Sequence, residues 1–146
     1  MISKVDRDLV GRKTSELNKN LKELESFRTI SLKKFSTTLA NQWTVFYGLQ
    51  ISIQLVIDIG NHILAAIGEN QIEEYVDIID KLGDRRIIPR KFAKQIRGMV
   101  GLRNILVHEY TKIDAKRIYE ILQGHLKDFY SYIRYINKYL EKSSKK

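Results

Sequence analysis

A long run of apolar residues, 39–67, constrains the fold of this chain more than any other feature. A helix over this run would have apolar side chains on nearly every side, and they include Trp43, Phe46, Leu49, Ile53, Val56, Ile57, Ile63 and Leu64. A helix that is apolar all round has to be buried against other elements, because a surface helix shows only one apolar stripe. We therefore expect residues 39–67 to form the central helix, with these side chains in the core.

Four polar residues interrupt the run at intervals of four, which places Gln50, Gln54, Asp58 and His62 in one row along the expected helix. The polar row makes the run a poor membrane span. Buried polar groups need hydrogen-bond partners, and two interpretations stay open. Either the row forms a network inside the core or at a subunit contact, or Asp58 and His62 lie beside a functional site and orient its residues.

The rest of the sequence predicts amphipathic helices, with no strand pattern and no repeat. Apolar residues recur at helical spacing in four further segments, residues 5–27, 72–82, 90–108 and 115–140. Ser31, Asn70 and Asp114 are the expected N-caps. We expect an all-α protein, an antiparallel bundle of about five to six helices. One domain should span residues 1–141, followed by a basic tail at 142–146.

The chain is basic, with 26 Lys and Arg residues against 17 Asp and Glu residues and a formal net charge of +9. Without the tail residues Lys142, Lys145 and Lys146 the net charge is still +6, so the domain itself is basic. A charge of this sign favours an acidic partner, and nucleic acid is the commonest one. A merely solvated surface is the alternative for part of the excess.

The chain has no cysteine, which excludes a disulfide scaffold and thiol catalysis and agrees with a reducing compartment. Its three histidines are scattered and show no metal-ligand spacing, so we expect neither a metal nor a cofactor. The first eight residues lack an apolar signal core. We therefore expect a soluble cytoplasmic protein that does not associate with a membrane.

Two sets of residues have two interpretations each. The expected helix at 90–108 carries four cations on its polar face, which either guide RNA phosphates or are simply solvated. The last expected helix carries four tyrosines, which either stack on RNA bases or cover an edge of the core. These residues are Arg90, Lys91, Lys94 and Arg97, and Tyr130, Tyr132, Tyr135 and Tyr139.

The most specific group of side chains lies in residues 101–110, Gly-Leu-Arg-Asn-Ile-Leu-Val-His-Glu-Tyr. Apolar residues recur here at helical spacing, so the segment is typical of the end of an amphipathic helix. Arg103 and His108 are five residues apart, which on a regular helix is roughly 140° around the axis and about 7.5 Å along it. Either the helix therefore ends near His108, or a second copy of the chain completes the site.

These side chains suit RNA cleavage without a metal. Such cleavage needs a base for the 2′-hydroxyl proton, positive charge on the phosphate oxygens and an acid for the leaving 5′-oxygen. A histidine such as His108 can serve as base or acid near neutral pH. Arg103 stays charged, and its planar fork suits the charge of the transition state. Asn104 can position the phosphate or fix the His108 ring by a hydrogen bond.

The spacing Arg103-x4-His108-x-Tyr110, with Asn104 directly after the arginine, resembles the signature of the HEPN superfamily and most of all its HepT-like branch. Two further segments carry the resemblance. They are Asp-Ile-Gly-Asn-His at 58–62 and Asp-Ala-Lys-Arg-Ile-Tyr-Glu-Ile-Leu at 114–122. Together the similar segments extend from about residue 5 to residue 140.

The resemblance implies a metal-independent endoribonuclease toxin of a type VII-like toxin–antitoxin system, neutralised by a minimal nucleotidyltransferase antitoxin. It implies a homodimer in which two copies of the motif surround one cleft and supply base and acid from different chains. It also implies that the nucleotidyltransferase transfers AMP to Tyr110. The competing class is a non-catalytic module that binds RNA or a nucleotide in the same cleft, or docks the nucleotidyltransferase, without cutting RNA.

Overall fold

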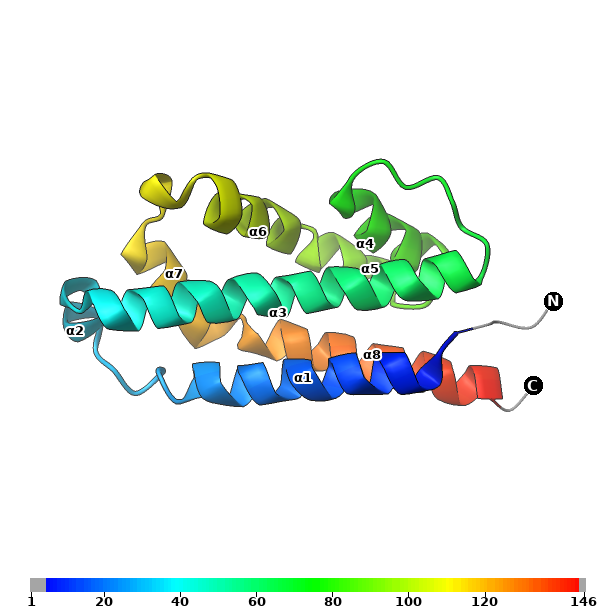
Figure 1. Ribbon diagram of the computed structural model, residues 1–146, viewed down its shortest axis with the longest axis horizontal. Coiled ribbons are helices and arrows are strands. Elements are labelled where there is room, and N and C mark those ends of the chain that lie inside the picture. Colours follow the sequence, from blue (N-terminus) through cyan, green and yellow to red (C-terminus); the bar gives the residue numbers. More distant parts are fainter. Residues whose placement is uncertain (1–4, 145–146) are drawn as a thin grey trace.

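The computed structural model describes residues 5–144, except the side chains of Tyr110 and Ser144 (Figure 1). These residues form helices and no strand. The helices are α1 (Arg7–Glu25), α2 (Leu32–Thr37), α3 (Leu39–Ala66), α4 (Tyr75–Asp84), α5 (Arg90–Ile96), α6 (Gly98–His108), the 3-10 helix η1 (Tyr110–Lys112), α7 (Ala115–Gly124) and α8 (Leu126–Ser144). The predicted all-α helical bundle is confirmed.

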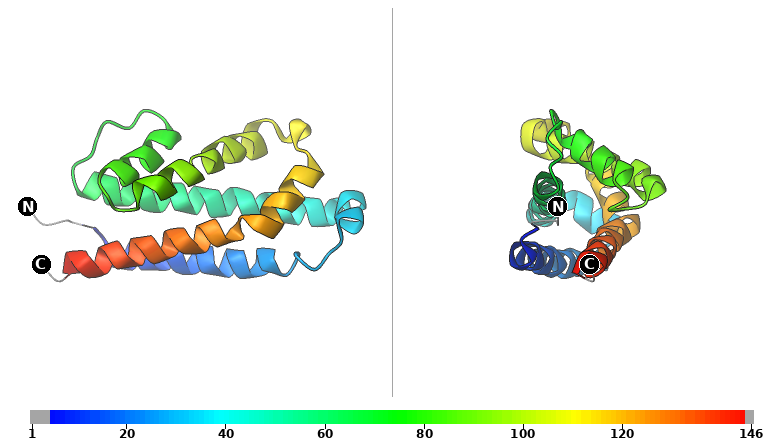
Figure 2. Two further views of the ribbon diagram at one scale, coloured as in Figure 1. Left: turned by 180° about the vertical axis from the view of Figure 1, so that it is seen from behind. Right: turned by 90° about the vertical axis from the view of Figure 1, so that its right-hand side faces the viewer.

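Helix α3 runs through the middle of the molecule and packs against α1, α2, α4, α6 and α7. Figures 1 and 2 show α1 and α8 along one side of α3, and α4, α5 and α6 along the other. Fully buried side chains at Val45, Leu49, Ile53, Val56 and Ile63 line α3, so the prediction of a central helix is confirmed.

By length and composition alone α3 also qualifies as a membrane span. Half of its most apolar 18-residue window is buried inside the bundle, as expected for the central helix of a packed domain.

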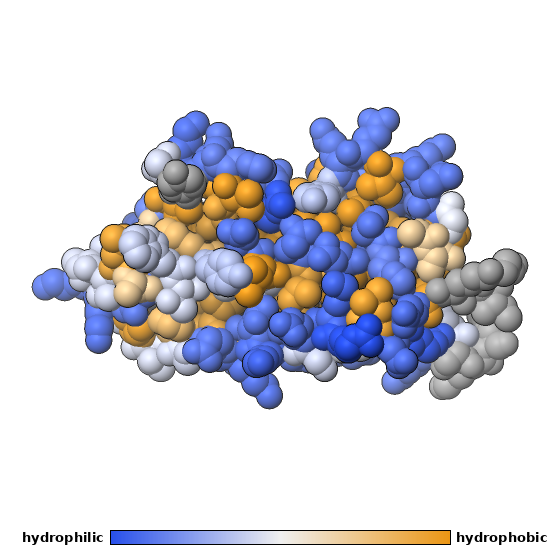
Figure 3. All heavy atoms as spheres, in the orientation of Figure 1, coloured by the Kyte–Doolittle hydropathy of each residue, from blue (hydrophilic) through white to orange (hydrophobic). Residues whose placement is uncertain are grey.

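One side of α3 is not covered by another described helix. The prediction that Trp43 lies in the core is wrong, because its exposed fraction is 63%. Leu39 and Tyr47 lie one turn away on either side and are 55% and 62% exposed. Figure 3 shows this surface as pale and orange spheres over the N-terminal half of α3. A run that is apolar all round does not indicate which of its sides lacks a neighbour.

Two predicted helices are each divided. The segment 90–108 bends at Arg97, which keeps helical torsions of φ −52° and ψ −35° between α5 and α6. Arg97 is held by Asp80 of α4, with Nε 2.7 Å from Oδ1, while α6 packs on α3. The segment 115–140 is divided at His125, whose ψ of 0° ends α7 directly after Gly124. Glycine is a poor helix former, which favours a break there.

The ends of four helices test the predictions of where helices begin and end. Ser31 and Asp114 are N-caps, and their side chains accept the N–H groups of Lys34 and Lys116. Asn70 is not the cap of α4. That helix begins later, because the carboxylate of Asp77 accepts the N–H groups that precede it. Helix α8 continues to Ser144, beyond the predicted domain end at residue 141.

Gly60 allows α4 to approach α3 closely in the core, and we expect Gly60→Ala to destabilise the bundle. An added Cβ would lie 2.8 Å from Ile78 Cγ2 and 2.9 Å from Leu82 Cδ1, both on α4. Overpacking of this kind costs about 1–3 kcal/mol. Gly11→Ala is the matched control, because nothing lies within 4 Å of its Cβ, and alanine is favoured in a helix by about 1 kcal/mol. The free energy of unfolding of each variant is measured in urea. Equal values for Gly60→Ala and Gly11→Ala would contradict this packing.

Candidate active site

The guanidinium of Arg103 is held at the junction of α3, α4 and α6. Its Nε donates a hydrogen bond to Oε1 of Gln54 on α3, at 3.0 Å. Its Nη1 donates to Oδ1 of Asn104, at 3.2 Å. Its Cζ lies 5.0 Å from the centroid of the Tyr75 ring, at the first residue of α4, within the range of a cation–π contact. Arg103 is half-buried and is therefore fixed in direction while part of it faces solvent.

The polar row of α3 continues from this guanidinium. Nε2 of Gln54 donates to Oδ1 of Asp58, at 2.9 Å. Oδ2 of Asp58 lies 4.0 Å from Nζ of Lys13 on α1. Asp58 is thus connected to Arg103 through Gln54, and among the described residues it makes no direct hydrogen bond or ion pair with the motif. Each of the two interpretations of the row therefore describes part of the arrangement. Gln54 and Asp58 form a hydrogen-bonded network, and this network reaches the motif at Arg103.

His62, further along the same row, serves a different contact. Its Nε2 accepts the backbone N–H of Asp6, at 3.0 Å. The carboxylate of Asp6 in turn caps α1 by accepting the N–H of Leu9, at 3.0 Å. The structure therefore places His62 at the start of α1 and does not bring it to Arg103.

His108 is the last residue of α6 and is exposed. Within residues 5–144 it has no hydrogen-bond or ion-pair partner among the described side chains, and none joins it to Arg103. The sequence left two possibilities, that the helix ends near His108 or that a second copy of the chain completes the site. The helix does end at His108. Arg103 nevertheless faces α3 and α4, whereas His108 faces solvent. Asn104, which bonds Arg103, is exposed on the same side of α6 as His108.

Tyr110 begins η1, two residues after His108. Its backbone is described, but its side chain lies outside the described part of the structure, so its predicted role rests on its position in the chain.

The position of Tyr75 depends on how α4 starts. The backbone N–H groups of Glu74 and Glu73 donate to Oδ2 of Asp77, at 2.9 Å and 3.0 Å. These bonds hold the pKa of Asp77 below its usual value. The ionised carboxylate therefore stabilises the first turn of α4 at neutral pH, and this contribution is lost as the pH falls through the lowered pKa.

The four cations at residues 90–97 and the four tyrosines of α8, each of which had two interpretations, lie in different surroundings. Arg90, Lys91 and Lys94 are exposed on α5, but Arg97 forms an ion pair with Asp80 and is not a free cation. Tyr132 is fully buried, and its hydroxyl donates to the backbone oxygen of Val56 at 2.9 Å. Burial raises the pKa of this hydroxyl far above its ordinary range.

The other three tyrosines of α8 are partly buried and pack against the core. Tyr132 therefore lies within the core, and Tyr130, Tyr135 and Tyr139 cover its edge.

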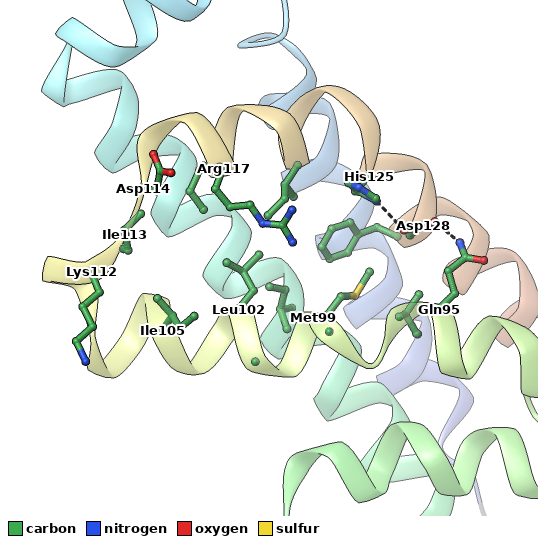
Figure 4. A pocket seen from close by; sticks show the side chains of 17 residues that line it. Gln95, Met99, Leu102, Ile105, Lys112, Ile113, Asp114, Arg117, His125 and Asp128 are labelled. Atoms are coloured by element: carbon green, nitrogen blue, oxygen red, sulfur yellow. Dashed lines mark hydrogen bonds and ion pairs between the residues drawn. The ribbon is translucent and has the colours of Figure 1, made fainter.

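A cavity of about 450 Å³ lies on the other side of α6, between α6, α7 and the start of α8 (Figure 4). Its walls include Met99, Leu102 and Ile105. At one end of the cavity, Nε2 of Gln95 donates a hydrogen bond to Oδ1 of Asp128, at 2.8 Å. Arg103, Asn104 and His108 are not among its lining residues, so this cavity is separate from the motif.

In the described part of the chain, no group of three His, Cys, Asp or Glu side chains is placed to hold a metal ion. Sequence reasoning missed two contacts of Arg103. The sequence places Gln54 in the polar row but does not show that it binds Arg103, and nothing in the pattern of residues 72–82 points to the contact of Tyr75 with Arg103.

The family model described as "Ribonuclease HepT-like" matches residues 17–136. This chain belongs to the HepT-like ribonuclease family. It is 30% identical over 139 residues to the tRNA nuclease HepT of Aphanizomenon flos-aquae, covering 95% of each chain. It is 26% identical over 126 residues to the mRNA nuclease HepT of Shewanella oneidensis, covering 86% of this chain and 94% of the relative. The family assignment confirms the resemblance seen in the sequence.

Solved structures of the family have the same fold. A tri-AMPylated Shewanella oneidensis HEPN toxin in complex with an MNT antitoxin aligns with a TM-score of 0.84 and 26% identity, covering 90% of this HepT-like chain and 98% of the other. A toxin–antitoxin structure with AMP-PNP aligns with a TM-score of 0.83 and 25% identity, covering 90% and 99%.

Proposed function

We propose that this HepT-like protein is a metal-independent endoribonuclease and the toxin of a type VII-like toxin–antitoxin pair, acting in the cytoplasm. The observation that carries the proposal is the fixed guanidinium of Arg103, five residues before the exposed His108. Two relatives are named as tRNA and mRNA nucleases, and two similar structures are toxin–antitoxin complexes. The basic net charge of +9 suits an RNA substrate.

The residues support cleavage by the RNA itself. His108 takes the proton of the 2′-hydroxyl, and the 2′-oxygen attacks the adjacent phosphorus. Arg103 stabilises the negative charge that develops on the non-bridging oxygens. The bond from phosphorus to the 5′-oxygen then breaks, and an imidazolium supplies a proton to that oxygen. The products are a 2′,3′-cyclic phosphate and a 5′-hydroxyl, and no step needs a metal.

A homodimer supplies the second proton-transfer group. One His108 side chain cannot hold the roles of base and acid in the same step, and each chain has only one motif. A two-fold axis would bring two copies together around one cleft. Helix α6 is suited to this contact, because Ile105 is an exposed apolar residue one turn before the exposed His108.

We expect RNA cleavage to continue in EDTA and to be lost in both Arg103→Ala and His108→Ala. The reason is that the first change removes the charge at the phosphate and the second removes the proton-transfer group. His125→Ala is the matched control, because this exposed histidine lies outside the motif. Cleavage of a labelled RNA and the thermal unfolding of each variant are measured together.

Full activity of His108→Ala would refute the assignment of this histidine. Activity that EDTA abolishes and magnesium restores would indicate a metal-dependent nuclease. RNA binding without cleavage by the wild type would favour the non-catalytic module.

We also expect a dimer in light scattering at micromolar concentration, with both chains needed for activity. If base and acid come from different chains, a 1:1 co-expressed mixture of wild type and His108→Ala should retain about one quarter of the wild-type activity, since only wild-type pairs are complete. Chains that act alone would retain about one half. A monomer that cleaves RNA at the full rate would exclude the shared cleft.

We expect AMP transfer to Tyr110 by the cognate nucleotidyltransferase, and this modification should switch cleavage off. Each adenylate adds bulk and a phosphodiester charge two residues from His108, where the substrate phosphate has to lie. A similar HEPN toxin is described as tri-AMPylated. Peptide mass spectrometry after incubation with the nucleotidyltransferase, ATP and magnesium should show adenylate mass increments on the peptide that contains Tyr110.

Tyr110→Phe is the control, because it should still cleave RNA but lose this modification. Modification confined to another tyrosine, or full cleavage by the adenylated protein, would defeat the proposal.

A further inference from the structure

We propose that Gln54 is the positioning residue for Arg103, and that Asp58 sets the direction in which the Gln54 amide points. The inference rests on the proposed ribonuclease function and adds to it two residues of α3 that act on the substrate through Arg103. Its basis is a continuous chain of side-chain contacts, from Lys13 through Asp58 and Gln54 to Arg103.

The contacts of Arg103 come from three directions and leave one nitrogen open. Gln54 accepts from Nε, Asn104 accepts from Nη1, and the ring of Tyr75 covers one face of the guanidinium. Nη2 has no hydrogen-bond partner among the described residues. A guanidinium held in this way keeps donors for a phosphate oxygen and loses little rotational freedom on binding.

The orientation of the Gln54 amide follows from the chemistry of its two neighbours. An ionised carboxylate only accepts hydrogen bonds, and a guanidinium only donates them. Asp58 must therefore face the NH₂ end of Gln54, and Arg103 must face the oxygen end. The carboxylate of Asp58 thus prevents the amide from flipping, so that the oxygen stays on Arg103.

A glutamine at this position also leaves the charge of Arg103 intact. A carboxylate here would form an ion pair with Arg103 and compete with the RNA phosphate for the guanidinium. It would also lie directly against Asp58, and two adjacent carboxylates repel one another. The neutral amide fixes the direction of Arg103 and leaves its positive charge available for the transition state.

The first test is spectroscopic and does not depend on activity. The Nε–H resonance of Arg103 is assigned in ¹⁵N-labelled protein as the one that disappears in Arg103→Ala. We expect slow exchange of this proton with water in the wild type and faster exchange, with a shifted resonance, in both Gln54→Ala and Asp58→Ala. Gln50→Ala is the matched control, because Gln50 lies one turn earlier in the same row and is not among the described hydrogen-bond partners of Arg103. An Nε–H resonance unchanged in Gln54→Ala would overturn the proposal.

The second test separates kcat from KM in RNA cleavage. Gln54→Ala should lower kcat on the order of tenfold to a hundredfold, because misplacing a group that acts in the transition state costs this much. Gln54→Glu should raise KM, because the new carboxylate competes with phosphate for Arg103. Gln50→Ala should change neither constant. Equal kinetics in Gln54→Ala and the wild type would refute a positioning role.

A double-mutant cycle then tests whether Asp58 acts through Gln54. If it does, Asp58→Ala should lower kcat in the wild type but cause no further loss in Gln54→Ala. Additive losses would show that Asp58 acts by another route. If the wild type cleaves no RNA at all, the proposed function fails, while the Nε–H exchange of Arg103 still decides whether Gln54 and Asp58 hold it.

Discussion

Helix α3 has to bury an apolar surface on most of its sides and still carry a row of polar side chains, and the rest of the structure depends on how these demands are met. Its buried residues bind α1, α4 and α6 into one core. Its polar row is only half-buried, and three of its four members have partners on other elements. Asp58 lies near Lys13, and Gln54 accepts a hydrogen bond from Arg103. His62 accepts one from the backbone of Asp6.

This arrangement connects stability with the site. The same helix that forms the core also fixes Arg103, so the guanidinium is attached to the helix at the centre of the bundle. A site that has to bind phosphate needs an arginine with a defined direction and an undiminished charge. Gln54 meets both needs, whereas His62, two turns further along, anchors the first helix instead. One row of residues thus serves the fold at one end and the site in its middle.

Much of the fold follows from periodicity, and the part that does not depends on tertiary packing. The run at 39–67 specified a central helix, and Ser31 and Asp114 specified helix starts through their capping side chains. The division between α5 and α6 at Arg97 has no signal in the apolar spacing of residues 90–108, and the contact of Arg97 with Asp80 joins residues that are 17 apart in the sequence. The exposure of Trp43 also depends on tertiary packing. An apolar residue in an apolar run does not indicate whether another helix covers it.

The motif at 101–110 pointed to Arg103 and His108 from spacing alone, but the sequence could not show what holds the arginine. The Gln54 contact spans 49 residues of sequence, and which turn of α3 faces α6 is decided by how the two helices pack. The sequence marks Gln54 and Asp58 as polar residues in an apolar run, but it does not show that Gln54 and the ring of Tyr75 both contact Arg103.

We propose that RNA is cut by attack of its own 2′-hydroxyl, without a metal. The most direct measurement is the chemical analysis of the ends that the purified protein leaves on a defined RNA in the presence of EDTA. The account predicts a 2′,3′-cyclic phosphate on one fragment and a 5′-hydroxyl on the other. A 3′-hydroxyl paired with a 5′-phosphate would contradict it, because those ends arise when water rather than the 2′-oxygen attacks the phosphorus.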